Sequence, residues 1–155
     1  MDLSRLLPEH HCVVRMKKES SLRDMLTHLV EPLVASGVVT DGGQFLDDVL
    51  AREEQLTTVV GNGTALPHAR SQAVSRLGLV VGLFDEGEEQ DFPGSNEEEG
   101  VQVVFLIAVP AFMPAAHLPL LKHVAKFIGY DRKIGKLLKS RTPAAACKYL
   151  QSYKG

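Results

Sequence analysis

The sequence predicts an α/β protein, a three-layer α/β/α sandwich in which a mixed sheet of about four to five strands lies between helices. Three observations lead to this fold class. Strand-like and helix-like segments alternate along the 155 residues. Residues 77–84 and 101–109 are almost continuously apolar, which is typical of strands covered on both faces. Several expected strands are consecutive in the middle of the chain, so the sheet should be mixed. The length fits one domain spanning residues 1–155.

The N-terminal part predicts a strand followed by a helix. Residues 12–16 are short, apolar and partly β-branched, as expected of a strand. Ser20 or Ser21 can cap a helix, because apolar side chains recur at helical spacing over residues 22–34. Pro32 lies inside that stripe, so we expect a kink there or a helix end just before it.

A second helix follows. Gly37 closes the first helix and Asp41 offers the next cap. Residues 52–54 end the second helix, and residues 57–60 change to a β-branched pattern. The expected inward residues of this helix are Phe45, Leu46, Val49 and Leu50.

The second half predicts two buried strands and three helices. Between the apolar runs, the acidic residues 85–100 are expected to form a solvated connection. Pro114 starts the first of these helices, and Asp131 and Thr142 cap the other two, with Pro143 at the favoured first position. The expected inward residues of the helix after Pro114 are Leu118, Leu121, Val124, Ala125 and Ile128.

Composition limits the function classes. The formal net charge is −2, and the basic residues form no long block, which argues against a general nucleic-acid binder. No apolar tract is long enough to cross a bilayer, and the N-terminus does not resemble a signal peptide. Cys12 and Cys147 lie far apart in sequence, which favours reduced thiols and a cytoplasmic location.

The usual motifs of metal and cofactor enzymes are absent. His10, His11 and Cys12 have no second cluster at metal-ligand spacing, and neither an H-E-x-x-H helix nor a C-x-x-C pair occurs. The phosphate-binding loop, the dinucleotide-binding glycine pattern and the G-x-S-x-G elbow are missing too. We therefore expect neither metal nor cofactor.

The histidines are the main candidates for chemistry, because imidazole changes charge near neutral pH and can act as a nucleophile. His28 and His123 lie within helical patterns and are expected to be surface or edge residues. His68 and His117 each follow an expected strand. His68 ends a segment in which two glycines free the backbone and Pro67 stiffens it.

These two histidines suggest a transient phosphohistidine site. His117 falls in the expected first turn of a helix, where free N–H groups and a partial positive charge suit a phosphoryl group. Arg52 or Arg70 could add charge-assisted hydrogen bonds. Two histidines after two strands can also arise by accident, so the residues alone leave both interpretations open.

A wider pattern resembles a known family. Arg52-Glu53 stands sixteen positions before the histidine that ends Gly61-Asn62-Gly63-Thr64-Ala65-Leu66-Pro67-His68. The strand at 105–110 and then His117-Leu118 follow. Together these resemble the type 2 (fructose/mannitol) IIA domains of the bacterial phosphoenolpyruvate-dependent phosphotransferase system. The resemblance covers essentially the whole chain and is greatest to the free-standing nitrogen-regulatory IIA proteins.

The resemblance implies a phosphotransferase component that works as a phosphoryl carrier. His68 would accept the phosphoryl group from the phosphocarrier HPr or a similar protein and pass it to a IIB domain or a regulatory target. His117 would assist, Arg52 would stabilise the phosphoryl group, and no metal or cofactor would be needed. Val59 and Thr64 depart from the family pattern, and the Thr64 hydroxyl could bond locally or reach the site.

Two other functions remain to be distinguished. A domain of the same fold could act as a non-catalytic regulatory module, by protein–protein contact alone. A metal-dependent hydrolase would need ligand spacing that the sequence lacks.

Overall fold

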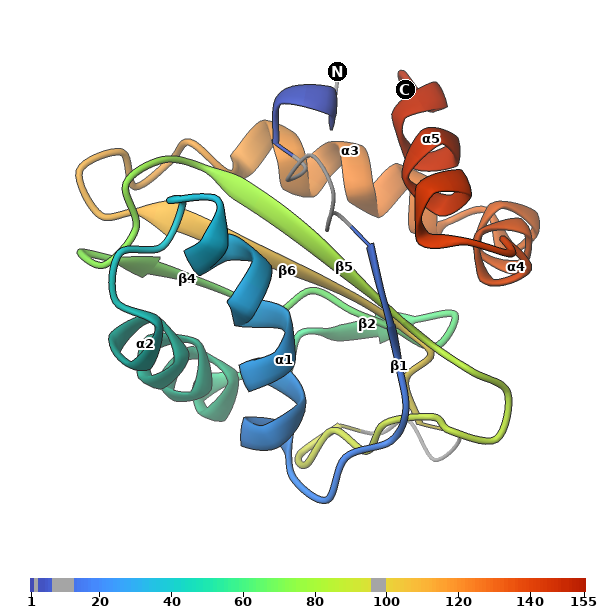
Figure 1. Ribbon diagram of the computed structural model, residues 1–155, viewed down its shortest axis with the longest axis horizontal. Helices are drawn as coiled ribbons and strands as arrows, with labels where there is room; N and C mark the ends of the chain where they lie inside the picture. The colour runs from blue at the N-terminus through green and yellow to red at the C-terminus, as the bar shows by residue number, and fades with distance from the viewer. Residues whose placement is uncertain (2, 7–12, 96–99) are drawn as a thin grey trace.

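The computed structural model describes residues 1, 3–6, 13–95 and 100–155. A mixed sheet forms the middle layer of the molecule. Helices α1 (Leu22–Ala35) and α2 (Gly42–Gln55) cover one face, and α3 (Leu118–Ile128), α4 (Asp131–Leu138) and α5 (Pro143–Ser152) lie on the other (Figure 1). The predicted three-layer α/β/α class is confirmed.

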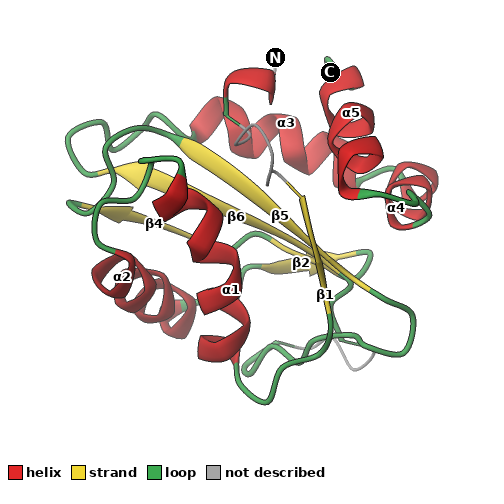
Figure 2. Cartoon of the chain, in the orientation of Figure 1, coloured by secondary structure: helices red, strands yellow, loops and turns green. Residues whose placement is uncertain are grey.

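The described part of the sheet has six strands, one more than the highest number predicted. The neighbouring strands β1, β5, β6, β3 and β2 form one path, and β4 pairs with β6 (Figure 2). β5 and β6 are antiparallel, whereas β1 is parallel to β5, and both β3 and β4 are parallel to β6. The strands are β1 (Val13–Met16), β2 (Val59–Gly61), β3 (Thr64–Ala65), β4 (His68–Ser71), β5 (Gly78–Phe84) and β6 (Val103–Pro110).

The central strand β6 is buried on both faces because each face packs on a different helical layer. Its odd-numbered residues Val103, Phe105, Ile107 and Val109 belong to the core under α3–α5. Its even-numbered residues Val104, Leu106 and Ala108 belong to the core under α1 and α2. This alternation is the period of two expected for a strand, so the continuous apolar run is used on both sides.

Most of the predicted helix starts agree with the structure. The Ser21 side chain accepts a hydrogen bond from the Asp24 N–H, and Asp41 and Thr142 cap α2 and α5 in the same way. Tyr130, rather than Asp131, is the N-cap of α4. The helix end expected before Pro32 is wrong, because α1 continues to Ala35. Burial of the apolar face of α1 outweighs the one backbone hydrogen bond that a proline cannot make.

Helix α3 differs most from the prediction. It begins at Leu118 rather than at Pro114, since residues 111–116 form turns. The buried face is correspondingly rotated from the predicted one and consists of Leu120, His123, Val124, Phe127 and Ile128. His123 is therefore a buried residue, and its expected surface position is wrong. His28 is exposed as expected, and its Nε2 lies 3.0 Å from a Glu19 carboxylate oxygen.

The two ends of the chain lie on the same side of the molecule (Figure 1). The Met1 amino group donates a hydrogen bond of 2.9 Å to the Lys154 carbonyl, and a short 3-10 turn covers Leu3–Arg5. Cys147 on α5 is disulfide-bonded, so the expectation of a reduced thiol is wrong there. No helix among the described residues has the length and apolarity required to span a bilayer.

Candidate functional site

A cleft of about 450 Å³ brings together residues from three separate parts of the chain. His68 comes from the start of β4, Arg52 from the last turn of α2, and His117 from the residue before α3. Arg70 follows His68 on β4. The complete lining consists of Asp48, Ala51, Arg52, Gln55, His68, Ala69, Arg70 and His117. All residues that the sequence singled out for phosphoryl chemistry thus line one cleft.

The segment before His68 forms a tight hairpin and then an edge of the sheet. Gly61, Asn62 and Gly63 all have positive φ, at 113°, 51° and 62°, and they join β2 to β3. The Asn62 side chain anchors this turn by donating a 2.7 Å hydrogen bond to the Ile128 carbonyl. The Pro67 carbonyl accepts from the Ile107 N–H at 3.0 Å, so His68 enters β4 from a backbone fixed to β6. His68 therefore begins a strand, rather than following one as predicted.

The imidazole of His68 is held by its own backbone. Its Nδ1 lies 2.7 Å from the Leu66 carbonyl oxygen, which can only accept a hydrogen bond. Nδ1 therefore carries the proton, and in the neutral ring Nε2 keeps a free electron pair. Burial, followed by the charges of Arg52 and Arg70, lowers the pKa of His68 below its ordinary value, while the Leu66 hydrogen bond opposes this shift. The ring is consequently neutral and nucleophilic at pH 7.

A chain of hydrogen bonds fixes the Leu66 carbonyl in turn. The buried Glu53 carboxylate accepts from the Thr58 N–H at 2.7 Å and from the Thr58 hydroxyl at 2.6 Å. The Thr58 carbonyl then accepts from the Leu66 N–H at 3.1 Å. Glu53 and Thr58 therefore connect α2 to the residue that orients His68. The sequence analysis missed this connection, because it treated Glu53 as one of several charges at a helix end.

His117 lies beside His68, with ring centroids 5.6 Å apart and planes inclined by 34°. It occupies the N-cap position of α3 rather than the predicted first turn, and its side chain makes no capping hydrogen bond. It is buried, and its Nδ1 has no hydrogen-bond partner. Burial, and then the charges of His68 and Arg70, lower the pKa of His117. This ring, too, is neutral at pH 7.

The two arginines of the cleft are anchored by backbone carbonyls. Arg52 donates from Nη1 to the Leu56 carbonyl at 2.9 Å, and Arg70 donates from Nε to the Pro114 carbonyl at 2.8 Å. The Arg70 bond ties β4 to the turns that lead to His117. A guanidinium has five N–H donors, so each arginine keeps donors available for an anion in the cleft.

The two departures from the expected pattern lie outside the cleft lining. Thr64 is buried, and its hydroxyl donates to the Asn62 carbonyl at 3.1 Å. Of the two alternatives for that hydroxyl, local bonding is thus the one observed. Val59 is an ordinary residue of β2, opposite Ala65 of β3.

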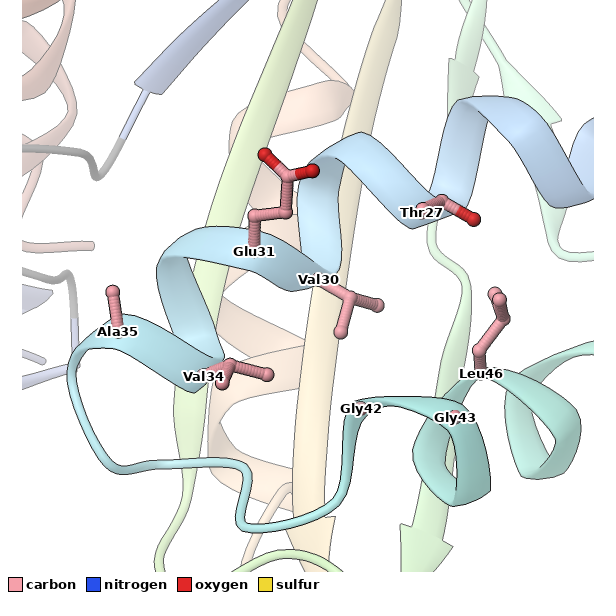
Figure 3. Close-up of a pocket in the computed structure, with 8 residues that line it drawn as sticks. All are labelled: Thr27, Val30, Glu31, Val34, Ala35, Gly42, Gly43 and Leu46. Carbon is pink, nitrogen blue, oxygen red and sulfur yellow. The ribbon is translucent and has the colours of Figure 1, made fainter.

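The structure has a second depression, between α1 and α2 (Figure 3). Its walls are mainly apolar, with Val30, Val34 and Leu46 pointing toward the gap between the helices and Glu31 pointing away from it. This groove contains neither histidine nor arginine. Within the described ranges no three His, Cys, Asp or Glu residues are grouped so as to hold a metal ion, and the segment His10-His11-Cys12 lies outside those ranges.

Comparison with known proteins identifies the relatives of the chain. Residues 7–153 match the family model described as phosphoenolpyruvate-dependent sugar phosphotransferase system, EIIA 2. The fructose-specific EIIA component of Haloferax volcanii is 31% identical over 74% of this chain and 72% of its own length. The nitrogen regulatory protein of Bradyrhizobium diazoefficiens is 33% identical over 63% of this chain and 61% of its own. Matches to both kinds of relative agree with the resemblance noted in the sequence.

Solved structures agree in fold. The mannitol-specific cryptic phosphotransferase enzyme IIA of Escherichia coli superimposes with a TM-score of 0.78 at 14% identity, over 97% of this chain and 99% of the other. The mannitol IIA in complex with phosphorylated IIB from the same organism superimposes with a TM-score of 0.75 at 19% identity. The match covers 92% of this chain and 95% of the other. Some relatives are much longer: the chain spans 19% of the Escherichia coli 2-O-alpha-mannosyl-D-glycerate-specific EIIABC component.

Proposed function

Because this chain belongs to the EIIA 2 family of the phosphoenolpyruvate-dependent sugar phosphotransferase system, we propose that it carries a phosphoryl group on Nε2 of His68. The chain is a component of such a system, and it acts as a carrier rather than as a stand-alone enzyme. The single observation that supports this assignment most strongly is the 2.7 Å contact between His68 Nδ1 and the Leu66 carbonyl. That contact leaves Nε2 as the nucleophilic nitrogen in a cleft with two arginines.

The transfer step balances without an added cofactor. The electron pair on His68 Nε2 attacks the phosphorus of a phosphohistidine on the donor protein. As the new N–P bond forms, the donor's N–P bond breaks and its electron pair returns to the donor imidazole. The proton stays on Nδ1 throughout and is donated to the Leu66 carbonyl oxygen, which stabilises the positive charge that the phosphorylated ring gains. Most of the catalysis in such a step comes from position and electrostatics.

His117 and Arg52 stabilise the transferred group. The buried Nδ1 of His117 has no acceptor for a proton, so the tautomer with the proton on Nε2 is favoured. From the cleft wall this Nε2–H can donate to a phosphoryl oxygen. Arg52 adds a charge-assisted hydrogen bond from the last turn of α2. Both groups favour the negative charge that spreads over the phosphoryl oxygens in the transition state.

The partners follow from this role. The donor is an HPr-like phosphocarrier, and the acceptor is a IIB domain or a regulated protein. A solved complex of mannitol IIA with phosphorylated IIB gives a precedent for the acceptor among proteins of this fold. We place the protein in the cytoplasm, where phosphoenolpyruvate is made, and treat residues 1–155 as one functional domain. No nucleic acid enters the reaction.

Reconstitution tests the proposal. The protein is incubated with phosphoenolpyruvate, enzyme I and the cognate HPr-like carrier, and its intact mass is measured. We expect one acid-labile phosphoryl group on the wild type, none on His68→Ala, and one on the matched control His28→Ala, whose histidine is exposed and remote. A wild type without label refutes the carrier role, and label that persists on His68→Ala refutes the site.

A regulatory role is the second candidate, because a nitrogen regulatory protein is among the relatives. In that case the phosphoryl group on His68 changes which protein the cleft binds. A pull-down that compares wild type with His68→Asp separates the two functions. Efficient transfer to a IIB domain supports the transport role, whereas a partner bound only in one phosphorylation state supports the regulatory role.

A further inference from the structure

The basic residues of the protein are concentrated in its C-terminal helical layer. Residues 122–155 contain nine of the 17 lysines and arginines but only one of the 19 acidic residues. These residues form most of α3, all of α4 and all of α5, which lie together on one face of the sheet (Figure 1). The protein as a whole is slightly acidic, so this layer is a cationic region that attracts anions to one side of the molecule.

A hollow of about 430 Å³ lies within this cationic layer. Its lining consists of Tyr130, Arg132, Lys133, Lys136 and Tyr149, so it contains three cations, two aromatic rings and no acid. Among the described residues no carboxylate lies within ion-pairing distance of these cations, since the observed ion pairs all involve residues 15–91. The hollow therefore carries positive charge that the protein itself does not neutralise.

The lysines of the hollow are held in place by the tyrosines. The Lys133 ammonium lies 5.6 Å from the centroid of the Tyr130 ring and 5.2 Å from that of Tyr153. The Lys136 ammonium lies 5.2 Å from the centroid of the Tyr149 ring. These are cation–π distances, which restrict long side chains that would otherwise be mobile. Less side-chain entropy is then lost when an anion binds.

We propose that this hollow binds a nucleoside polyphosphate. Its phosphates contact Arg132, Lys133 and Lys136, whose three charges match the charge of a di- or triphosphate. Its base lies against the ring of Tyr130, which is 54% exposed. The volume falls in the range of small-molecule sites, and a concave shape suits such a ligand better than a flat membrane surface.

This site is separate from the phosphoryl cleft. Helix α3 begins just after His117 and runs from Leu118 to Ile128, and the hollow lies beyond its far end, on α4 and α5. Eleven helical residues span about 16 Å, so a ligand in the hollow does not cover His68. Binding there consequently goes beyond the carrier function and can be measured without it.

The test uses ATP, GTP, tripolyphosphate and adenosine as probes, in calorimetric and NMR titrations of the full chain at low salt. We expect both nucleotides to bind with a dissociation constant of roughly 10–500 μM and to shift signals of α4 and α5. The double variant Arg132→Gln/Lys136→Gln should weaken ATP binding about tenfold or more. The matched control Lys122→Gln/Lys126→Gln removes the same charge from exposed positions of α3 and should weaken it less than about twofold.

Tyr130→Ala separates the contributions of base and phosphate. It should weaken the binding of ATP more than the binding of tripolyphosphate, because the base contacts the ring directly, whereas the phosphates lose only the contact that restricts Lys133. Unfolding midpoints and His68 phosphorylation should match the wild type in both double variants, which shows that they fold.

Several results overturn the proposal. One is the absence of any shift in α4 and α5 at about 5 mM ATP. Another is an equal loss of ATP affinity in both double variants, which would mean that net charge alone, and not the hollow, determines binding. Tripolyphosphate that binds as tightly as ATP refutes the base contact. Binding to anionic lipid vesicles or to single-stranded RNA without ATP binding identifies a macromolecular surface instead.

Discussion

Thr58→Val tests the hydrogen-bond chain that orients His68. Valine has almost the shape of threonine but lacks the hydroxyl that donates to Glu53 at 2.6 Å. The residue Glu53 is only 6% exposed, so water replaces the lost donor poorly. The variant keeps the second hydrogen bond, from the Thr58 N–H to Glu53. Its effect therefore reports one buried, charge-assisted hydrogen bond.

The expected loss follows from that geometry. A hydrogen bond to a charged group contributes about 1.5–3 kcal/mol to the free energy of unfolding. For a domain of this size each kcal/mol lowers the melting temperature by about 2–4 °C, so we expect a fall of about 3–12 °C. The matched control is Thr57→Val. The Thr57 hydroxyl accepts only a 3.3 Å bond from the Val59 N–H, and its removal should lower the melting temperature by less than about 4 °C.

A second measurement distinguishes orientation of His68 from general stability. The Leu66 hydrogen bond raises the pKa of His68, and Thr58 holds Leu66. Loosening Thr58 should therefore lower the NMR titration midpoint of His68, whereas Thr57→Val should leave it unchanged. A Thr58→Val protein that melts normally refutes the assigned bond to Glu53. One that melts early with an unchanged His68 midpoint refutes the connection between this bond and the histidine.

Three further predictions concern the cleft and its titration. Burial lowers the pKa of His68, so the rate of phosphorylation should be constant above pH 6.5 and fall only below it; a rate that already falls between pH 8 and 7 contradicts this. Burial also lowers the pKa values of three histidines, His68, His117 and His123. Below pH 6.5 the unfolded chain therefore binds more protons than the folded one, which destabilises the fold. Chemical denaturation should accordingly give a lower free energy of unfolding at pH 5.5 than at pH 7.5. Arg52→Gln should slow phosphorylation of His68 about 10–100-fold. His117→Ala should still receive the phosphoryl group on His68 but pass it on more slowly. Quench-flow measurements with the donor and the acceptor protein check both expectations.

The sequence predicted the parts of the fold that depend on local patterns. Cap residues such as Ser21 and Asp41 act within one helical turn, and the apolar runs of β5 and β6 show burial directly. Local patterns did not predict that two separate short strands, β3 and β4, would pair with the same side of β6. This arrangement depends on Leu66 and Pro67, which interrupt the edge between two short pairings to β6.

The start of α3 shows a second limit of local reasoning. Pro114 is a favourable first residue for a helix, but its carbonyl accepts from Arg70 of β4, and the helix begins four residues later. This tertiary contact places His117 before the helix and turns His123 inward. Long-range contacts of this kind leave no periodic signal in the sequence.

The residues of the candidate site were easier to predict than the residues that hold them in position. His68, His117 and Arg52 were identified from residue type, spacing and the family resemblance, and they line one cleft. Glu53 and Thr58 were not identified, because a glutamate at the end of a helix is usually exposed. Only the fold shows that Glu53 is buried and bonded twice to Thr58.

The most direct test of the account is the position of the phosphoryl group on the protein. The phosphorylated chain, labelled with ¹⁵N in its histidines, is examined by two-dimensional NMR of the imidazole nitrogens. We predict one phosphoryl group, on Nε2 of His68, with the Nδ1 proton still bonded to the Leu66 carbonyl. A phosphoryl group on Nδ1 of His68, or on either nitrogen of His117, contradicts the account.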